Sequence, residues 1–381
     1  MPQTDKQPSR KPGFLACEAL LTAPTNARPH PADEEFHRGR CVWITGAGGS
    51  IGGALARTIA MFQPAALVLL DAAEHGLFEL DLWLSQAAPA VPRRLITGNC
   101  GDERLLCGLL LEAVPDLIYH AAAHKHVPLM EQNPFAAVAN NALGTWRLAK
   151  TLGSSPAGRL LMISTDKAAN PSSIMGTSKR IAEIALAACS HPDFPMNSVR
   201  LGNVLGTQGS VLATFQAQLL TGGPLTVTHP DAERYFLRMD CAVALILAAM
   251  RMASEGAIVA PVAAAGLRVL HLAEYLIAQH RTTEEEAVGI TITGLRDGEK
   301  LRETFAGKSE LAGAPLGDTL RSIETPAVYT DFSGTMRRLQ RATEERDLEA
   351  MLQAVRLLVP DYVVSTLLNQ QLHSTRGATH A

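Results

Sequence analysis

The chain has 381 residues, enough for one large or two modest domains, and its composition of 47% hydrophobic and 19% charged residues is ordinary for a soluble globular protein. The net charge of −3 and the lack of a Lys/Arg-rich run argue against nucleic acid or an anionic membrane surface as the main partner. No apolar run reaches the ~20 residues of a membrane span, no signal peptide is convincing, and the six cysteines lack C-x-x-C spacing, so we expect a cytoplasmic protein with reduced thiols.

Residues 1–38 are rich in Pro, Thr and charge, which predicts a flexible N-terminal arm. From residue 39 onward, apolar strand-like stretches alternate with stretches of helical periodicity, and no hairpin signal separates them. This alternation predicts an α/β fold, with a Rossmann-type doubly wound parallel sheet over residues 39–200.

After residue 200 the sequence becomes rich in Gly and turn residues, which predicts a smaller, interleaved C-terminal substrate domain. We assign residues 201–236 and 263–340 to it, with 237–262 returning to the first domain. Residues 341–362 are amphipathic and predict a final helix, and 363–381 form a tail.

The stretch "TGAGGSIGG" (45–53) lies between a predicted strand and a predicted helix that starts near Ser50 and Ile51. Gly46 permits a tight turn, Gly49 lets the backbone approach a pyrophosphate, and Gly52 lets the helix pack on the strand. A tight turn without a ligand would use the same glycines. The strand, the helix and an acid at the end of the next strand favour nucleotide binding.

That acid is Asp71, 19 residues after Gly52. A carboxylate there accepts protons from both ribose hydroxyls of NAD and repels the 2′-phosphate of NADP. No Lys or Arg between Asp71 and Pro92 offsets it, so NAD is favoured, with NADP as the alternative. Asn99 follows the third strand and can accept from the adenine amino group. The predicted cofactor-binding residues are Gly46, Gly49, Ser50, Ile51, Gly52, Asp71, Asn99, Cys100, Ala121, Ala122, Ala123, Asn141 and Lys179.

In "STDKAANPSSIMGTSKR" (164–180), Met175 and Lys179 are four residues apart. A Tyr-x-x-x-Lys pair here would be the acid/base couple of a short-chain dehydrogenase/reductase. A thioether has no proton to give and is a poor acceptor, so other groups must move the protons.

Together with "HAAAHKHVPLMEQNP", "RLGNVLGTQGSV", "GGPLTVTHPDAERYF" and "GLRDGEKL", these motifs make the chain, from about residue 40 to about 362, resemble the nucleotide-sugar 4,6-dehydratases of the extended short-chain dehydrogenase/reductase superfamily. It is most similar to the polysaccharide-biosynthesis branch that acts on UDP-N-acetylglucosamine. Some members of that branch carry Met in place of Tyr and are active. Many of these also have an N-terminal transmembrane region.

The resemblance implies oxidation at sugar C4, elimination of water across C5 and C6, and return of the hydride to C6 by a retained cofactor. Lys167 is the candidate base at C5 and must be neutral to act, so its pKa must fall. Asp166 is the candidate acid for the departing C6 hydroxyl and must be protonated. A solvated surface turn is the alternative for this Thr-Asp-Lys stretch.

The remaining catalytic assignments follow from the missing phenol. Thr165 or Ser164 is expected to relay the proton of the 4-hydroxyl towards the Asp166 carboxylate. Lys179 is expected to hold the nicotinamide ribose, and Met175 to fill the slot beside the ring and exclude water.

Substrate contacts are carried over from the same motifs. Asn203 is expected at the diphosphate, Arg234 and Arg296 offer forked donors for phosphate oxygens, and Glu299 can accept from the uridine ribose. Lys125 and His126 complete the predicted substrate-binding residues. Structural ion pairs or surface charges are the alternative for the arginines.

His120, His124 and His126 form H-x-x-x-H-x-H, a spacing that raises the question of a metal. Similar family members carry residues like His120, Lys125 and His126 without a metal, so we predict none. His124 departs from the family pattern.

Two other functions use the same motifs. One is a UDP-hexose 4-epimerase or a combined dehydratase/C5-epimerase. The other is a catalytically inactive regulatory subunit that binds NAD and a nucleotide sugar. For any of them we expect a UDP-sugar partner and a homo-oligomer, because such assemblies are common in the superfamily.

Overall fold

A mostly parallel nine-stranded sheet forms the centre of the computed structural model, which describes residues 28–153, 158–262, 266–280, 288–326 and 331–378. The strand order is β14-β15-β11-β6-β5-β4-β1-β2-β3, and the seven strands from β11 to β3 are parallel. The strands are β1 (Cys41–Thr45), β2 (Ala66–Asp71), β3 (Arg93–Thr97), β4 (Leu117–His120), β5 (Arg159–Thr165), β6 (Met196–Leu201), β11 (Ile258–Pro261), β14 (Leu311–Leu316) and β15 (Leu320–Glu324). This order confirms the predicted doubly wound α/β fold.

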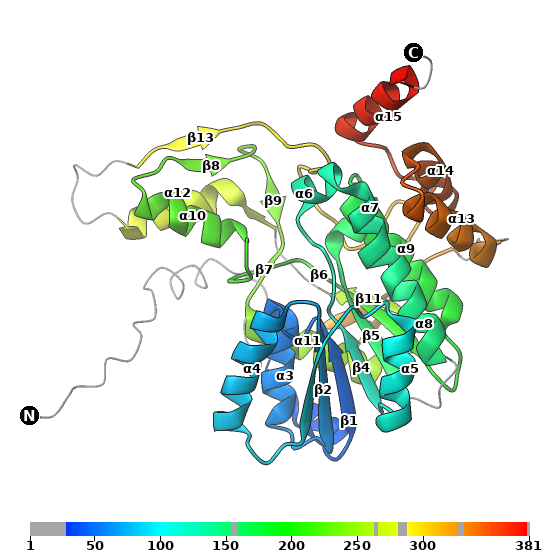
Figure 1. The fold of residues 1–381 in the computed structure, drawn as a ribbon. Helices are drawn as coiled ribbons and strands as arrows, with labels where there is room; N and C mark the ends of the chain where they lie inside the picture. Colours follow the sequence, from blue (N-terminus) through cyan, green and yellow to red (C-terminus); the bar gives the residue numbers. More distant parts are fainter. Residues whose placement is uncertain (1–27, 154–157, 263–265, 281–287, 327–330, 379–381) are drawn as a thin grey trace, which may run out of the picture.

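Helices cover both faces of the sheet, so the central strands are continuous apolar runs rather than alternating ones. One face packs against α3 (Ser50–Ala60), α4 (Glu74–Ala87) and α11 (Met239–Met252). The other packs against α5 (Glu103–Glu112), α8 (Thr145–Gly153) and α9 (Ile174–Cys189). Figure 1 shows the two helical layers on either side of the strands.

The N-terminal boundary differs from the prediction. Pro31–His37 is not part of an extended arm but a short helix, α2, with His30 as its N-cap and Pro31 at its first turn. His37 is fully buried and its Nε2 lies 2.7 Å from the Tyr119 hydroxyl of β4. The seven-residue helix therefore packs on the sheet domain. Residues 1–27 of the predicted arm lie outside the described residues.

Residues 203–237 and 267–292 contain a small lobe with its own apolar core. Its elements are β7 (Asn203–Val204), α10 (Val211–Leu220), β8 (Leu225–Val227), β9 (Glu233–Arg234), β10 (Phe236–Leu237), β12 (Leu267–Arg268), α12 (Val269–His280) and β13 (Ile290–Ile292). A hydrogen bond from Gln208 N to Ser50 Oγ (3.2 Å) places this lobe beside the first turn of α3. The lobe therefore adjoins the Gly-rich loop.

The C-terminal part departs from the predicted boundaries. β14 and β15, expected in the substrate domain, join the large sheet as its antiparallel edge. The predicted final helix is two helices, α13 (Phe332–Glu344) and α14 (Leu348–Leu358), which share an apolar core with α9. The predicted tail contains α15 (Thr366–Ala378).

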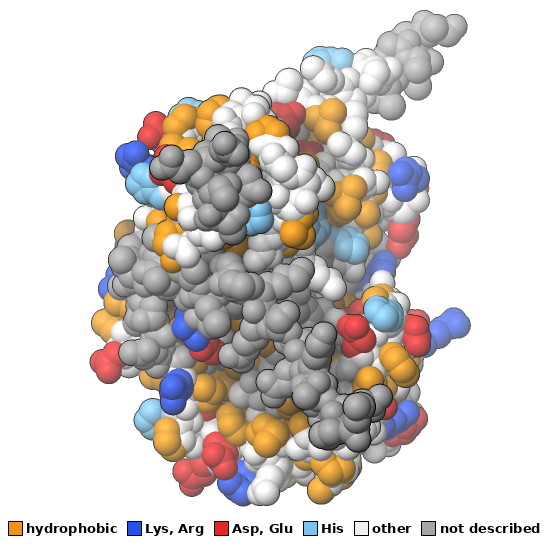
Figure 2. Space-filling model, turned by 90° about the vertical axis from the view of Figure 1, so that its left-hand side faces the viewer, with side chains coloured by type: hydrophobic (Ala, Val, Ile, Leu, Met, Phe, Trp, Pro, Cys, Tyr) orange, Lys and Arg blue, Asp and Glu red, His pale blue; other side chains and the backbone are white. Residues whose placement is uncertain are grey.

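Figure 2 shows the face that carries the small lobe, where acidic and basic side chains are interspersed with hydrophobic ones over its described part. None of the helices in the described ranges has the length and hydrophobicity needed to cross a membrane.

Candidate functional site

The Gly-rich loop is packed so tightly that side chains are excluded from it. A Cβ on Gly46, whose φ is +70°, would lie 2.6 Å from the backbone of Ala121 and Ala122. A Cβ on Gly52 would lie 2.1 Å from Gly46 O. Gly49 is the N-cap residue of α3, and no side chain in the described ranges caps that helix. The amides that begin α3 at Ser50 therefore remain available to an anion such as a pyrophosphate.

Asp71 stands at the carboxyl end of β2, beside this loop. Its Oδ2 accepts from Gly48 N (2.9 Å) and its Oδ1 from Ala73 N (2.8 Å), so the carboxylate is fixed in place. Gly76, in the first turn of α4, lies against the same loop, because a Cβ there would be 2.5 Å from Gly48 O. Sequence reasoning missed Gly76. Its signal was a glycine inside the otherwise helical stretch "EHGLFELDLW".

The loops after β3 and β4 complete this edge of the sheet. Asn99 Oδ1 accepts from Gly101 N (2.7 Å), and burial raises the pKa of the neighbouring Cys100 thiol to about 11. Ala121 N donates to Thr45 O (2.9 Å), which holds the Ala121–Ala123 stretch against the Gly-rich loop. These residues thus surround one edge, as a dinucleotide site requires.

Asn141 lies in a π-helix, Val138–Gly144, a distortion often found at functional sites. Its Oδ1 accepts from His124 N (2.8 Å), and its Nδ2 donates to His124 O (2.9 Å) and to Ser178 Oγ (3.0 Å). Asn141 therefore ties the loop after β4 to α9, directly beside Lys179. The contact uses the backbone of His124, so the identity of that side chain still has no explanation.

The three histidines are not gathered as metal ligands. His120 is fully buried between Thr45 and Thr145, with ring nitrogens 2.7 and 2.8 Å from their hydroxyls. Burial lowers the pKa of His120 to about 3, so the ring is neutral at pH 7. The ring of His126 lies instead against Gly209 of the small lobe.

Three of the candidate catalytic residues meet where β5 ends. Thr165 is the last residue of the strand, and Asp166 and Lys167 open the one-turn 3-10 helix η3 (Asp166–Ala168). Thr165 Oγ1 donates to Asp166 Oδ1 (2.9 Å), and Lys167 Nζ donates to the same oxygen (2.9 Å) and to Asn203 Oδ1 (3.0 Å). Asp166 is fully buried, and its Oδ2 has no hydrogen-bond partner among the described residues.

Two carboxylates hold Lys167 as an ammonium. Burial alone would lower the pKa of Lys167, but the carboxylates of Asp166 and Glu303 raise it above its usual value. This direction is opposite to the one that a base at C5 needs. Glu303 was not among the predicted site residues, because it lies 136 positions after Lys167 and only the fold brings them together.

Met175 and Lys179 lie one turn apart on α9, which Ser173 caps by accepting from Gly176 N (3.1 Å). Met175 is 2% exposed and belongs to the apolar core shared by α9, α13 and α14. Burial lowers the pKa of Lys179 to about 8, against the opposing charge of Glu183. The position at which a Tyr was expected is therefore apolar, and Lys179 loses its proton at lower pH than an ordinary lysine.

Ser164 and Thr165 point to different surroundings, as neighbours in a strand do. Ser164 Oγ donates to Glu183 Oε1 (2.6 Å) inside a buried ion-pair network with Arg200. Burial would raise the pKa of Glu183, but Arg200 lowers it to about 2. Of the two relay candidates, only Thr165 contacts Asp166 in this arrangement.

The predicted substrate residues lie on the lobe side of the site. Arg234 Nη2 donates to Glu299 Oε1 (2.9 Å), and Arg296 Nε lies 3.4 Å from Glu299 Oε2. The three side chains are thus gathered, and here they pair with one another. Burial lowers the pKa of both Lys125 and His126, on the loop after β4.

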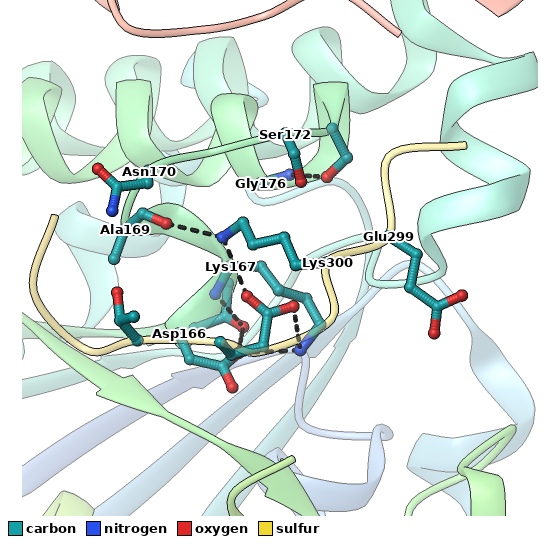
Figure 3. A network of polar contacts seen from close by, with 12 residues as sticks. Asp166, Lys167, Ala169, Asn170, Ser172, Gly176, Glu299 and Lys300 are labelled. Carbon is teal, nitrogen blue, oxygen red and sulfur yellow. Dashed lines mark hydrogen bonds and ion pairs between the residues drawn. The ribbon is translucent and has the colours of Figure 1, made fainter. Parts of the chain in front are cut away.

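A contact network joins η3 to the segment that follows β13 (Figure 3). Lys300 Nζ donates to Ala169 O (2.8 Å) and Glu303 Oε2 (2.9 Å). Ser172 Oγ donates to Gly298 O (2.9 Å). The segment carrying Glu299 is therefore fastened to the one carrying Lys167.

Sequence comparison relates the chain to polysaccharide biosynthesis proteins. The family described as polysaccharide biosynthesis protein matches residues 42–320. The capsular polysaccharide biosynthesis protein CapD of Staphylococcus aureus is 38% identical over 71% of this chain and 46% of its own. The probable polysaccharide biosynthesis protein EpsC of Bacillus subtilis (strain 168) is 36% identical over 83% and 53%. The chain thus spans about half the length of these relatives.

Solved structures share the fold. Pen from Bacillus thuringiensis superposes with a TM-score of 0.71 at 25% identity, covering 76% of this chain and 90% of that one. DesIV, a dTDP-glucose 4,6-dehydratase from Streptomyces venezuelae crystallised with NAD, gives 0.62 at 20% identity, covering 80% and 98%. The chain therefore belongs to the family of polysaccharide biosynthesis proteins, built on the extended short-chain dehydrogenase/reductase fold.

Proposed function

We propose that the chain is an NAD-dependent 4,6-dehydratase of a UDP-N-acetylhexosamine, with UDP-N-acetylglucosamine as the first candidate. The observation that carries this proposal is the Asp166–Lys167 ion pair at the carboxyl end of β5. The Asp166 Oδ2 is buried there and lacks a hydrogen-bond partner among the described residues, a bond that a substrate hydroxyl would supply. An epimerase returns the hydride to C4, so it has no chemical need for an acid at C6 and a base at C5.

The residues present fit a nicotinamide dinucleotide. The loop at Gly46 and Gly52 leaves room only for backbone, and α3 begins there without a side-chain cap from the described residues. Asp71 is held at the next strand end, where its charge favours the free ribose hydroxyls of NAD over the phosphate of NADP. When bound, NAD supplies the redox chemistry that oxidises C4 and later reduces C6.

We infer a proton route that follows the hydrogen bonds at the end of β5. The proton of the C4 hydroxyl passes to Thr165, which gives its own to Asp166 along the existing 2.9 Å bond. Asp166 then protonates the departing C6 hydroxyl, so the C4 hydroxyl proton leaves as part of the water. Lys167, whose side chain is 21% exposed, first releases its ammonium proton to water, then takes the C5 proton and later returns one to C5.

The same route relieves the charge that opposes a neutral Lys167. Once Asp166 has accepted a proton, its carboxyl is neutral and no longer raises the pKa of Lys167. Burial, which lowers that pKa, then weighs more heavily. The oxidation step therefore prepares the base for the elimination step.

Proton NMR of the purified protein with UDP-N-acetylglucosamine in heavy water, without added cofactor, tests the proposal. A 4-keto-6-deoxy product with deuterium at C5 is expected, and its spectrum also gives the C5 configuration. The C4 epimer as product would refute the Asp166/Lys167 mechanism. An unchanged substrate, with NAD and the nucleotide sugar both shown to bind, would support the inactive-subunit function.

A further inference from the structure

Glu303 is a buried acid that none of the steps above uses. Its side chain is 3% exposed, and its two oxygens face two different lysines. Oε1 lies 3.9 Å from Lys167 Nζ, and Oε2 accepts from Lys300 Nζ at 2.9 Å. A buried carboxylate persists only when it is paired, and here one of its partners is the candidate base.

The position of Glu303 is fixed by the segment around it. Lys300 also donates to Ala169 O, one residue beyond η3, and Lys308 N donates to Asn170 Oδ1 (2.7 Å). With the Ser172–Gly298 bond, these contacts attach residues 298–308 to residues 169–172. The distance from Glu303 to Lys167 is thus set by side-chain-to-backbone hydrogen bonds between the two segments.

We propose, on the basis of the proposed function, that Glu303 is a positioning residue for the dehydration: it holds the ammonium of Lys167 and sets the pH at which Lys167 becomes a base. Lys300 opposes it by sharing the same carboxylate. The pair Glu303–Lys300 thus tunes Lys167 from the segment that follows the small lobe, outside the Thr-Asp-Lys motif.

The charges around Lys167 explain why this pair matters during turnover. Asp166, Glu303 and Arg234 are the charged groups that act on it, the two acids raising its pKa and the arginine lowering it. When Asp166 is protonated by the substrate, Glu303 is the remaining carboxylate beside Lys167. The ammonium of Lys300 then partly neutralises this carboxylate and so weakens its attraction for Lys167.

Two substitutions are expected to act in opposite directions. Glu303→Gln removes the carboxylate, so the pKa of Lys167 falls. Lys300→Met leaves the carboxylate without its second partner, so the pKa of Lys167 rises. A displacement of one pH unit in either direction changes the neutral fraction of Lys167 about tenfold below its midpoint. Lys308→Met, an exposed neighbour with the same chemical change, is the control and should behave as wild type.

Two measurements on the whole 381-residue chain with bound cofactor test this. The first follows the Lys167 signal in carbon NMR of protein enriched at lysine Cε, assigned by its loss in Lys167→Arg, as a function of pH. The second is the rate of deuterium exchange at C5 of the 4-keto-6-deoxy product. Both profiles should move to lower pH in Glu303→Gln and to higher pH in Lys300→Met. In Glu303→Asp, which keeps a carboxylate, both profiles should move back from the Glu303→Gln position towards that of the wild type.

The outcomes separate this inference from the proposed function. If both variants lower the maximal rate without displacing either profile, or displace both in the same direction, Glu303 is only structural and the inference is wrong. The lysine titration needs no turnover. If the wild-type protein yields an epimer, the proposed function fails, while opposite displacements in the titration would still establish the coupling of Glu303 to Lys167.

Discussion

At the scale of the residue, the site depends on one oxygen atom, Asp166 Oδ1, which binds both Thr165 and Lys167. The other carboxylate oxygen has no partner among the described residues. In the proposed route, this one side chain receives the proton of Thr165 and passes it to the departing C6 oxygen. Under the proposed function, this route through the end of β5 takes the place of the Tyr hydroxyl that Met175 does not provide.

Asp166→Asn tests that route. The amide keeps the shape of the side chain but can neither accept the proton from Thr165 nor give one to the C6 oxygen. We expect kcat for dehydration to fall by about 10²- to 10⁴-fold, the range typical of a lost general acid. Product formation by NMR is the measurement, and bound NAD should remain at the wild-type level. The exposed Asp193→Asn is the matched control, and wild-type turnover in Asp166→Asn would contradict the role.

At the scale of the element, the Gly-rich loop holds the cofactor edge together because backbone touches backbone. Gly52→Ala would place a methyl group 2.1 Å from Gly46 O. This clash is with a backbone atom, which cannot swing aside as a flexible side chain could. We expect loss of bound NAD, measured by absorbance of the denatured extract, and a lower melting temperature.

The matched control is Gly108→Ala in α5. Gly108 is exposed within the helix, and a Cβ added there would meet nothing within 4 Å. Replacing a helical glycine by alanine should stabilise the protein by roughly 0.5–1 kcal/mol, with NAD unaffected. If both alanine variants kept NAD equally, the steric explanation of the loop would be wrong.

Elements also show how far the sequence predicts the structure. The loop at 45–53 was predictable because strand, glycines and helix are adjacent in the chain. β14 was not, because "LAGAPL" contains Gly and Pro and lies exposed at the sheet edge, without the apolar run of a central strand. α2 was missed because its charged sequence is also typical of an extended arm, although Pro31 followed by Asp33 and Glu34 in the first turn was a helix-start signal.

Some contacts of the site could likewise be predicted from the sequence, and others could not. Thr165, Asp166 and Lys167 were predicted from one short motif, since their neighbours in sequence are their neighbours in space. The contact of Lys167 with Glu303 depends on how the small lobe returns to the sheet, which no local pattern encodes. The charge state of Lys167 could not be predicted without that contact.

At the scale of the whole molecule, Arg200 joins three distant segments. It lies fully buried on β6 and pairs with Glu183 of α9 and with Glu310, which precedes β14. Arg200→Met would leave two buried carboxylates without their main partner. We expect the free energy of unfolding to fall by roughly 3–5 kcal/mol in urea denaturation at pH 7, while Met in place of the exposed Arg337 should change it little.

The same network predicts acid sensitivity. The pKa of Glu183 is about 2 in the folded protein against 4.5 for an ordinary glutamate. A lowered pKa stabilises the fold above about pH 4.5, and this contribution is lost as the pH falls from there towards 2. Urea denaturation at pH 7 and pH 4 should show this decline in the wild type and a smaller one in Arg200→Met. Equal declines would mean that other carboxylates dominate.

The order of the strands has a consequence for how the chain folds. β11 and β15 follow β6 in the order of the sheet, yet the residues of the small lobe separate β6 from both in the sequence. The sheet can therefore be completed only after the chain has travelled through the lobe and back, a pairing of high sequence separation that folds slowly. A chain cut anywhere between β6 and β15 would leave a parallel strand with an open edge, and such edges are sites of aggregation.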